Sequence, residues 1–159
     1  MNHADPTSLT MPSATQIVIT RSFDAPRWLV FEAWTTPEHV RRWYGPSDLA
    51  MPVCEIDLRV GGRWRYVLRA PDGSEHGYWG EYLEIVRPER LVYSEGYEGL
   101  PLGHDHTVTT TFTERDGKTT LTSTLDYRSQ GDRDGHVASG MEPGMRETLD
   151  RLEAVLSAL

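Results

Sequence analysis

The residues with the most metal-like spacing are His104 and His106, which flank Asp105. In a strand, residues two apart point to the same face, so the two imidazoles would offer ring nitrogens that suit zinc or copper. A metal site needs a third or fourth ligand at fixed geometry, and no nearby Glu, Cys or His has motif spacing. We therefore interpret this segment as a polar loop that ends where a strand begins, and we predict neither a metal nor a cofactor.

Cys54 is the single cysteine of the chain, which excludes an internal disulfide and a Cys-rich zinc site. A thiolate next to a base would be a nucleophile. However, Cys54 alternates in phase with Ile56 and Leu58, so we predict that it is a small buried hydrophobe. The chain also lacks the Gly-x-Ser-x-Gly and His-Glu-x-x-His motifs. No catalytic residue follows from these patterns.

Glu81 is the carboxylate with the most informative neighbours, because Trp79 and Leu83 share its phase in an aromatic strand. If that phase faces the concave side of a sheet, Glu81 is a general acid or base with a raised pKa, or an anchor for a ligand's polar group. In the other register, Glu81 lies in water. The residues that point inward are then Tyr78, Tyr82 and Glu84. The periodicity leaves both registers open.

Aromatic residues give the main indication of a binding site. Together with two methionines of the last helix, they suit a deformable apolar pocket, in which Tyr hydroxyls and Trp N–H groups orient the ligand. The same side chains would equally fill a core. With Glu81 included, the candidate cavity residues are Trp43, Trp64, Tyr66, Trp79, Glu81, Tyr82, Tyr93, Met141 and Met145.

The elements that position these residues change period along the chain. Residues 1–14 are polar and aperiodic and are interpreted as a flexible tail. Residues 17–23 predict a strand, and two short helices follow, each starting at a proline. Apolar residues three and four apart predict a long terminal helix that begins near Glu142. Six further strands are predicted near residues 54–60, 64–69, 76–86, 91–95, 107–114 and 119–127.

The 159 residues suffice for a single domain, predicted over residues 15–159. Sixteen Lys and Arg against 24 Asp and Glu give a formal net charge of −8. Such an acidic surface repels phosphate backbones, so we expect no nucleic acid partner and no membrane partner. No apolar run is long enough to span a bilayer, and the first residues do not resemble a signal peptide. We therefore expect a cytoplasmic location.

Several stretches together resemble a known family. They are residues 21–26 (RSFDAP), 30–38 (VFEAWTTPE), 43–46 (WYGP), 57–64 (DLRVGGRW), 80–85 (GEYLEI), 88–93 (PERLVY), 140–142 (GME) and 149–152 (LDRL). The chain is similar to the START-like (SRPBCC) superfamily, in the branch of the activator of heat-shock-protein-90 ATPase homologues. The resemblance implies an α+β helix-grip fold. In that fold, a seven-stranded antiparallel sheet wraps around a long C-terminal helix, two short helices follow the first strand, and a cavity separates sheet and helix.

The resemblance implies three functions, of which binding of a small hydrophobic or aromatic molecule is the favoured one. The second is an enzyme, because relatives on this fold include polyketide cyclases and aromatases; its candidate residues are Glu81, Tyr66 and Tyr82. The third is an interaction protein of the stress response with a chaperone or homodimer partner. The eukaryotic co-chaperone that names the family has an additional N-terminal domain for chaperone binding, so the name does not establish this activity here. Two departures, Met145 where many relatives carry tryptophan and the unusual Pro143, affect one cavity mouth.

Overall fold

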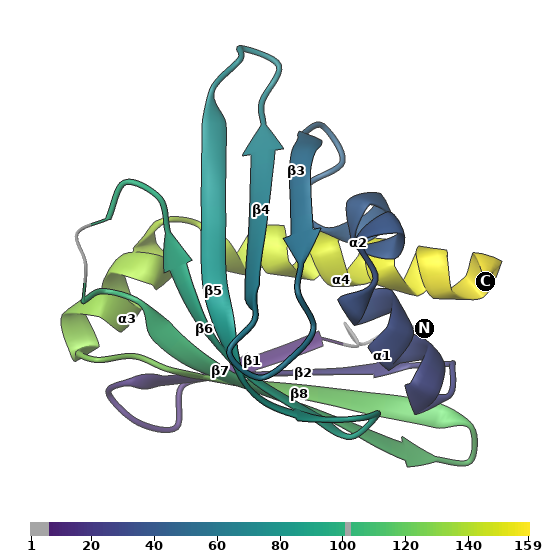
Figure 1. Ribbon diagram of the computed structural model, residues 1–159. Coiled ribbons are helices and arrows are strands. Elements are labelled where there is room, and N and C mark those ends of the chain that lie inside the picture. The colour runs from purple at the N-terminus through teal and green to yellow at the C-terminus, as the bar shows by residue number, and fades with distance from the viewer. Residues whose placement is uncertain (1–6, 101–102) are drawn as a thin grey trace, which may run out of the picture.

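The computed structural model describes residues 7–100 and 103–159 (Figure 1). Within these ranges, eight strands form one antiparallel sheet in the order β1-β2-β8-β7-β6-β5-β4-β3. The strands are β1 (Thr7–Thr10), β2 (Gln16–Phe23), β3 (Ala50–Ile56), β4 (Arg63–Arg69), β5 (Glu75–Val86), β6 (Arg90–Tyr97), β7 (His106–Arg115) and β8 (Lys118–Asp126). The helices are α1 (Arg27–Thr35), α2 (Pro37–Trp43), α3 (Gln130–Ala138) and α4 (Met141–Ala158).

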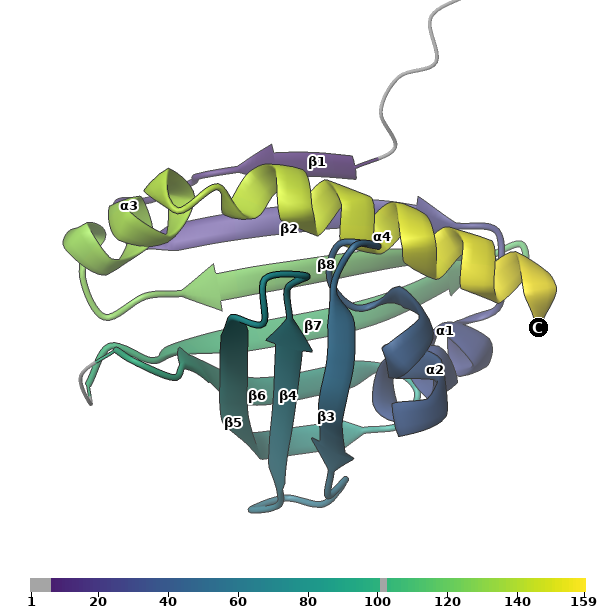
Figure 2. The ribbon, with the colours of Figure 1, turned by 90° about the horizontal axis from the view of Figure 1, so that it is seen from above.

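The sheet bends strongly, so that β3, β4 and β5 run across the direction of β2, β8 and β7 (Figure 2). Helix α4 lies along the inner side of this bend, with α1 and α2 near its C-terminal end and α3 at its other end (Figures 1 and 2). An antiparallel sheet with one apolar face needs such a cover. The predicted α+β helix-grip architecture, with two short helices after a strand and a long C-terminal helix, is confirmed.

Strand β1 corrects two predictions. The sequence patterns indicate seven strands and a tail over residues 1–14, but Thr7–Thr10 pairs antiparallel with β2, with Thr7 opposite Arg21. The Arg21 Nη1 donates a hydrogen bond of 2.8 Å to the Thr7 hydroxyl. Leu9 is the single apolar residue of this edge strand and packs half-buried against the core, and one apolar residue gives no hydrophobic periodicity that would reveal the strand. Residues 1–6 of the predicted tail lie outside the described residues.

Helix α3 is a second element that the sequence patterns do not predict. The hydroxyl of Ser129 caps its N-terminus and accepts a hydrogen bond of 3.1 Å from the Asp132 amide. The helix contains Gly131 and Gly135 and has no fully buried residue. It therefore lacks the apolar stripe by which an amphipathic helix is recognised in a sequence.

Helix α4 closes the core from its middle to its C-terminus, where its buried residues are Leu149, Leu152, Val155 and Leu156. A buried arginine joins this helix to the sheet. The Arg21 side chain is 0% exposed and contacts Asp150 at 2.6 Å and Glu153 at 2.5 Å, both from α4. The helix is thus held over β2 by charge as well as by apolar packing. Its N-terminal half carries the half-buried Met141 and Met145 instead.

Candidate functional site

A cavity of about 1000 Å³ lies between the bent sheet, the loop after α2, and helices α3 and α4. Its walls come from β4 to β8 together with the N-terminal half of α4. The volume is at the upper end of the range in which proteins bury small molecules, about 300–1000 Å³. The fold therefore leaves space for a ligand under the N-terminal half of α4, which covers the cavity, whereas the rest of the helix packs on the core.

Aromatic rings in mutual contact form one wall of this cavity. Tyr44, from the loop after α2, meets Tyr66 edge-on with ring centroids 4.8 Å apart and Tyr78 at 6.0 Å. Trp64 continues the wall, with ring centroids 4.8 Å from Tyr66 and 5.9 Å from Tyr93. Burial raises the pKa of the Tyr44, Tyr66 and Tyr93 hydroxyls, which stay protonated at neutral pH. The wall is apolar but carries hydroxyls that serve as hydrogen-bond donors and acceptors.

Most of the candidate residues from the sequence line this cavity. The residues that do so are Trp43, Trp64, Tyr66, Tyr82, Tyr93, Met141 and Met145. Two of the tryptophans also have structural hydrogen bonds: Trp43 Nε1 donates to the Ala33 carbonyl at 3.0 Å, and Trp64 Nε1 donates to the Ser94 carbonyl at 3.2 Å. Their indole N–H groups are thus already used by the protein. Their ring faces remain as the contact surface.

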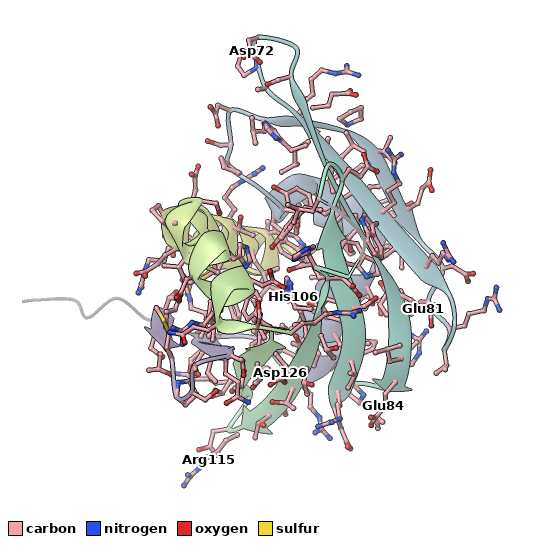
Figure 3. All side chains as sticks on the ribbon, turned by 90° about the vertical axis from the view of Figure 1, so that its left-hand side faces the viewer. Asp72, Glu81, Glu84, His106, Arg115 and Asp126 are labelled. Atoms are coloured by element: carbon pink, nitrogen blue, oxygen red, sulfur yellow. The ribbon has the colours of Figure 1, made fainter. Side chains whose placement is uncertain are left out.

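Trp79 and Glu81 do not lie in the cavity, which corrects their place among the candidates. Side chains alternate along β5, and the residues of the opposite phase, Tyr78 and Tyr82, line the cavity. Trp79 and Glu81 instead line a separate depression of about 600 Å³ on the other face of the sheet. Figure 3 shows Glu81 on the side of the sheet that faces away from the helices. Of the two open registers, the one with Tyr78 and Tyr82 inward is correct.

The prediction that Glu84 points inward in that same register is wrong, because Glu84 lies on the outer face. A β-bulge interrupts the pairing of β5 with β6 between Tyr82 and Glu84, and the extra residue reverses the phase beyond it. Glu84 is exposed and contacts Arg90 at 3.2 Å. Because Leu83 and Val86 are apolar although both are exposed on the outer face, the alternation of apolar residues does not locate the bulge.

A polar cluster that the sequence patterns missed lies at the end of the cavity near α3. Glu95 Oε1 accepts a hydrogen bond from His106 Nε2 at 2.9 Å and lies 3.5 Å from the Tyr97 hydroxyl. His136 of α3 contacts two hydroxyls, that of Tyr97 at Nε2 and that of Tyr127 at Nδ1, each at 2.5 Å. The cluster thus ties α3 to β6 and to the end of β8. Figure 3 shows His106 on the helix side of the sheet.

The electrostatics of the cluster favour an ionised Glu95 and a neutral His136. Burial raises the pKa of Glu95, but the hydrogen bond and charge of His106 outweigh burial, so that this pKa lies below its ordinary value. Burial lowers the pKa of His136 to about 4. A neutral imidazole has one N–H and one lone pair, so one of its two tyrosine partners accepts a hydrogen bond and the other donates one. The cavity therefore contains an ionised carboxylate that is paired with His106 and lies near the neutral His136.

The phase of two strands contained a signal for this cluster. Glu95 lies two residues after Tyr93 and four after Leu91, both of which face inward, and His106 lies two before the buried Val108. Residues two apart in a strand share a face, so both polar side chains were due to point inward. Tyr127 carried the same signal, because it lies two residues after the buried Leu125 in the strand predicted near residues 119–127. His136 carried none, because α3 has too few apolar residues to show an apolar period.

The family model of the activator of Hsp90 ATPase homolog 1-like proteins matches residues 24–157. The chain belongs to this family. The matched region includes α1, α2 and nearly all of α4, so it spans the cavity and its cover. No curated protein sequence matches the chain.

Solved structures agree with the family in fold. A protein of Rhodobacter sphaeroides has a TM-score of 0.90 and 29% identity over 97% of this chain and 99% of its own. A protein of Mycobacterium smegmatis has a TM-score of 0.85 and 25% identity over 97% and 99% of the two chains. A protein of Arthrobacter aurescens has a TM-score of 0.84 and 26% identity over 96% and 92%. These three chains thus share the fold of this chain over 92–99% of their own length.

The two histidines with metal-like spacing have separate partners in this family member. His104 Nδ1 lies 2.8 Å from Asp132, whereas His106 contacts Glu95. In the part of the chain that the structure describes, no group of three or more His, Cys, Asp or Glu is arranged to hold a metal ion. Among the same residues, no helix has the length and apolar character that crossing a membrane requires.

Cys54 lies on β3 and is buried, as its phase with Ile56 predicts. Burial raises the pKa of its thiol to about 11, so the reactive thiolate is scarce at neutral pH. The sulfur lies 3.8 Å from the Pro37 carbonyl. This environment fits a packing role and offers no nucleophile to the cavity.

Proposed function

We propose that the protein binds a small hydrophobic or aromatic molecule in the cavity between the sheet and α4. The observation that carries this proposal is the cavity of about 1000 Å³ with its wall of contacting aromatic rings. The cavity opens to solvent, since exposed residues such as Leu100 are part of its lining, so its apolar wall is in contact with water until a ligand covers it. A ligand that fills the cavity would remove this apolar wall from water.

The cover of the cavity supports the same proposal. Met141 and Met145 project from α4 onto it, and unbranched thioether side chains adapt to ligands of different shape. Helix α3 closes one end without a fully buried residue of its own, so few apolar contacts oppose its displacement. Both features favour entry of a ligand at this end of the molecule.

The first experiment compares native with denaturing mass spectrometry of freshly purified protein, followed by a thermal-shift screen of aromatic and lipid-like compounds. We expect an added mass under native conditions alone, or a compound that raises the melting temperature by mass action. The variant Met145→Trp should weaken binding because the larger side chain occupies the cavity mouth. Leu83→Trp, on the exposed outer side of β5, is the matched control and should bind normally.

Two results together would refute the proposal: no native adduct, and no compound that raises the melting temperature of the wild type. Equal binding by wild type and Met145→Trp would show that the ligand lies elsewhere. The comparison with Leu83→Trp separates a blocked cavity from a general effect of an added tryptophan.

Acid–base catalysis in the same cavity is a second candidate, favoured by the Glu95–His106 contact of 2.9 Å beside neutral His136. Tyr66 and Tyr82 line the cavity as the sequence prediction required, whereas Glu81 does not. A poly-β-carbonyl probe incubated with wild type should then give a cyclised product that Glu95→Gln fails to form. A chaperone or homodimer partner stays a prediction from the family resemblance; co-purification with the cell's own chaperone and the native mass test them.

A further inference from the structure

We propose that the cavity selects molecules in which an apolar or aromatic body carries a protonated amine, with the Glu95 carboxylate as the counter-ion. This inference rests on the proposed function, because it names the class of ligand for the same cavity. Its basis is the position of one carboxylate, the rings around it and the charges of the whole lining.

Only one of the two carboxylate oxygens of Glu95 takes part in the hydrogen bonds described above. Both of its contacts, with His106 Nε2 at 2.9 Å and with the Tyr97 hydroxyl at 3.5 Å, are made by Oε1. Among residues 7–100 and 103–159, no side chain or backbone group donates to Oε2. The Glu95 side chain keeps 18% of its surface accessible and lines the cavity, while His106 beside it is 1% exposed. A ligand donor thus completes the hydrogen bonding of this carboxylate.

Aromatic rings from three parts of the chain line the cavity together with this carboxylate. After burial, the negative charge of Glu95 is the next cause that raises the pKa of Tyr44, Tyr78 and Tyr93. These tyrosines come from the loop after α2, from β5 and from β6. Ring faces attract cations, and the attraction increases when water is excluded. A carboxylate among tyrosine rings is therefore a favourable environment for an ammonium group and an unfavourable one for an anion.

The remaining charged groups of the cavity lining also favour a cationic ligand over an anionic one. Its carboxylates are Glu75, Glu95, Glu98 and Asp132, and no Lys or Arg of the described residues lines the cavity. Glu75 contacts Arg69 at 2.8 Å and Glu98 contacts Arg65 at 2.6 Å, so both have a permanently charged partner. Of the described residues, Glu95 contacts only His106 and the Tyr97 hydroxyl, neither of which is a permanent charge, and the nearby His136 is neutral. With four carboxylates and no Lys or Arg in the described lining, an anionic ligand would meet an excess of negative charge at this end of the cavity.

The test uses three probes that share one ring system: 1-pyrenemethylamine, 1-pyrenemethanol and 1-pyreneacetic acid. Binding to the full-length protein at pH 7 is followed by the change in pyrene emission. We expect the amine to bind about 10-fold or more tighter than the alcohol, as a charge-assisted hydrogen bond gives, and the acid to bind most weakly. Glu95→Gln should remove the preference for the amine and leave the affinity for the alcohol within about 3-fold, since charge is lost while packing is kept.

Glu81→Gln is the matched control, because it removes one carboxylate from the neighbouring strand on the outer face of the sheet. It should leave all three affinities unchanged. If the alcohol binds and the amine shows no preference in wild type, the inference about charge is overturned while the proposed function stands. If the preference survives in Glu95→Gln, the inference is likewise overturned. If none of the three probes binds, the inference is overturned, and the proposed function is decided separately by the native adduct and the thermal-shift screen. The wild-type comparison needs no variant, so a folding defect in Glu95→Gln does not obscure the result.

Discussion

Neutralising the two carboxylates that contact Arg21 should destabilise the protein more than removing Arg21 itself. The Arg21 side chain is 0% exposed, whereas Asp150 and Glu153 are 66% and 48% exposed. In Asp150→Asn/Glu153→Gln the guanidinium stays buried without a counter-charge. In Arg21→Met the charge disappears, and the two carboxylates are free to be hydrated. The two variants therefore separate the cost of a buried charge from the value of its contacts.

The magnitudes follow from the same geometry. An uncompensated buried charge costs about 3–5 kcal/mol, and the half-exposed partners already share water, so we expect a loss of about 2–3 kcal/mol for the double variant. Arg21→Met loses the hydrogen bond to the Thr7 hydroxyl, worth about 1 kcal/mol. It also removes Arg21 Nε, the buried polar atom that has no hydrogen-bond partner among the described residues. We therefore expect a net loss of about 1 kcal/mol or less.

The assay is urea unfolding at pH 7, followed by the fluorescence of the five tryptophans. Asp57→Asn/Glu84→Gln is the control, because it neutralises two carboxylates of exposed ion pairs and should change the free energy of unfolding by less than about 1 kcal/mol. If Arg21→Met proves less stable than Asp150→Asn/Glu153→Gln, the contacts outweigh the buried charge and the reasoning is wrong. An equal loss in the control pair would assign the effect to net charge instead.

Three further measurements test other parts of the structure. Gly80→Ala would place a Cβ 1.8 Å from the Ser94 carbonyl oxygen and should lower the free energy of unfolding in urea by about 2–3 kcal/mol. In Gly144→Ala the added Cβ meets no atom within 4 Å, so helix propensity should raise the same free energy by about 0.5–1 kcal/mol. Burial lowers the pKa of His136 from 6.5 to about 4, so unfolded chains bind more protons in this window, and stability should fall by at most about 3 kcal/mol as pH falls from 6.5 to 4. In His136→Gln that pH-dependent loss should be smaller; an unchanged curve would contradict the assignment. With its pKa near 11, the Cys54 thiol should react with a disulfide reagent at pH 8 roughly 100-fold more slowly in the native state than in urea.

The sheet was the most predictable part of the molecule, because alternation of apolar and polar residues is a direct consequence of strand geometry. Cys54 and Ile56, or Trp64 and Tyr66, have the phase in the structure that they have in the sequence. Alternation did not predict strand β1, because this strand is four residues long and is held by backbone pairing with β2 and by the hydrogen bond from Arg21. Helix α3 escaped it because a helix without a buried face has no apolar period.

Residue type predicted most of the aromatic residues that line the cavity. It did not predict which face of β5 points into the cavity. Alternation alone gives two equivalent faces, so Trp79 and Glu81 were as plausible as Tyr78 and Tyr82 until the pairing of β5 placed them. Glu95 is the opposite case, since its phase with Tyr93 indicated an inward carboxylate. A choice of candidates by aromatic residue type alone leaves Glu95 out. An acid in phase with an apolar face is thus as informative as the rings beside it.

Helix α4 divides the molecule into an end that provides stability and an end that contains the cavity. Its four buried residues, Leu149, Leu152, Val155 and Leu156, all lie from the middle of the helix onward. The part of α4 before Leu149, together with α3, covers the cavity with half-buried or exposed residues. Glu95 lies at this second end, where apolar packing contributes least to the free energy of unfolding. Because Gln at this position still accepts the hydrogen bond from His106, the loss of the charge should change ligand affinity more than stability. A carboxylate needed only for the fold would show the reverse order.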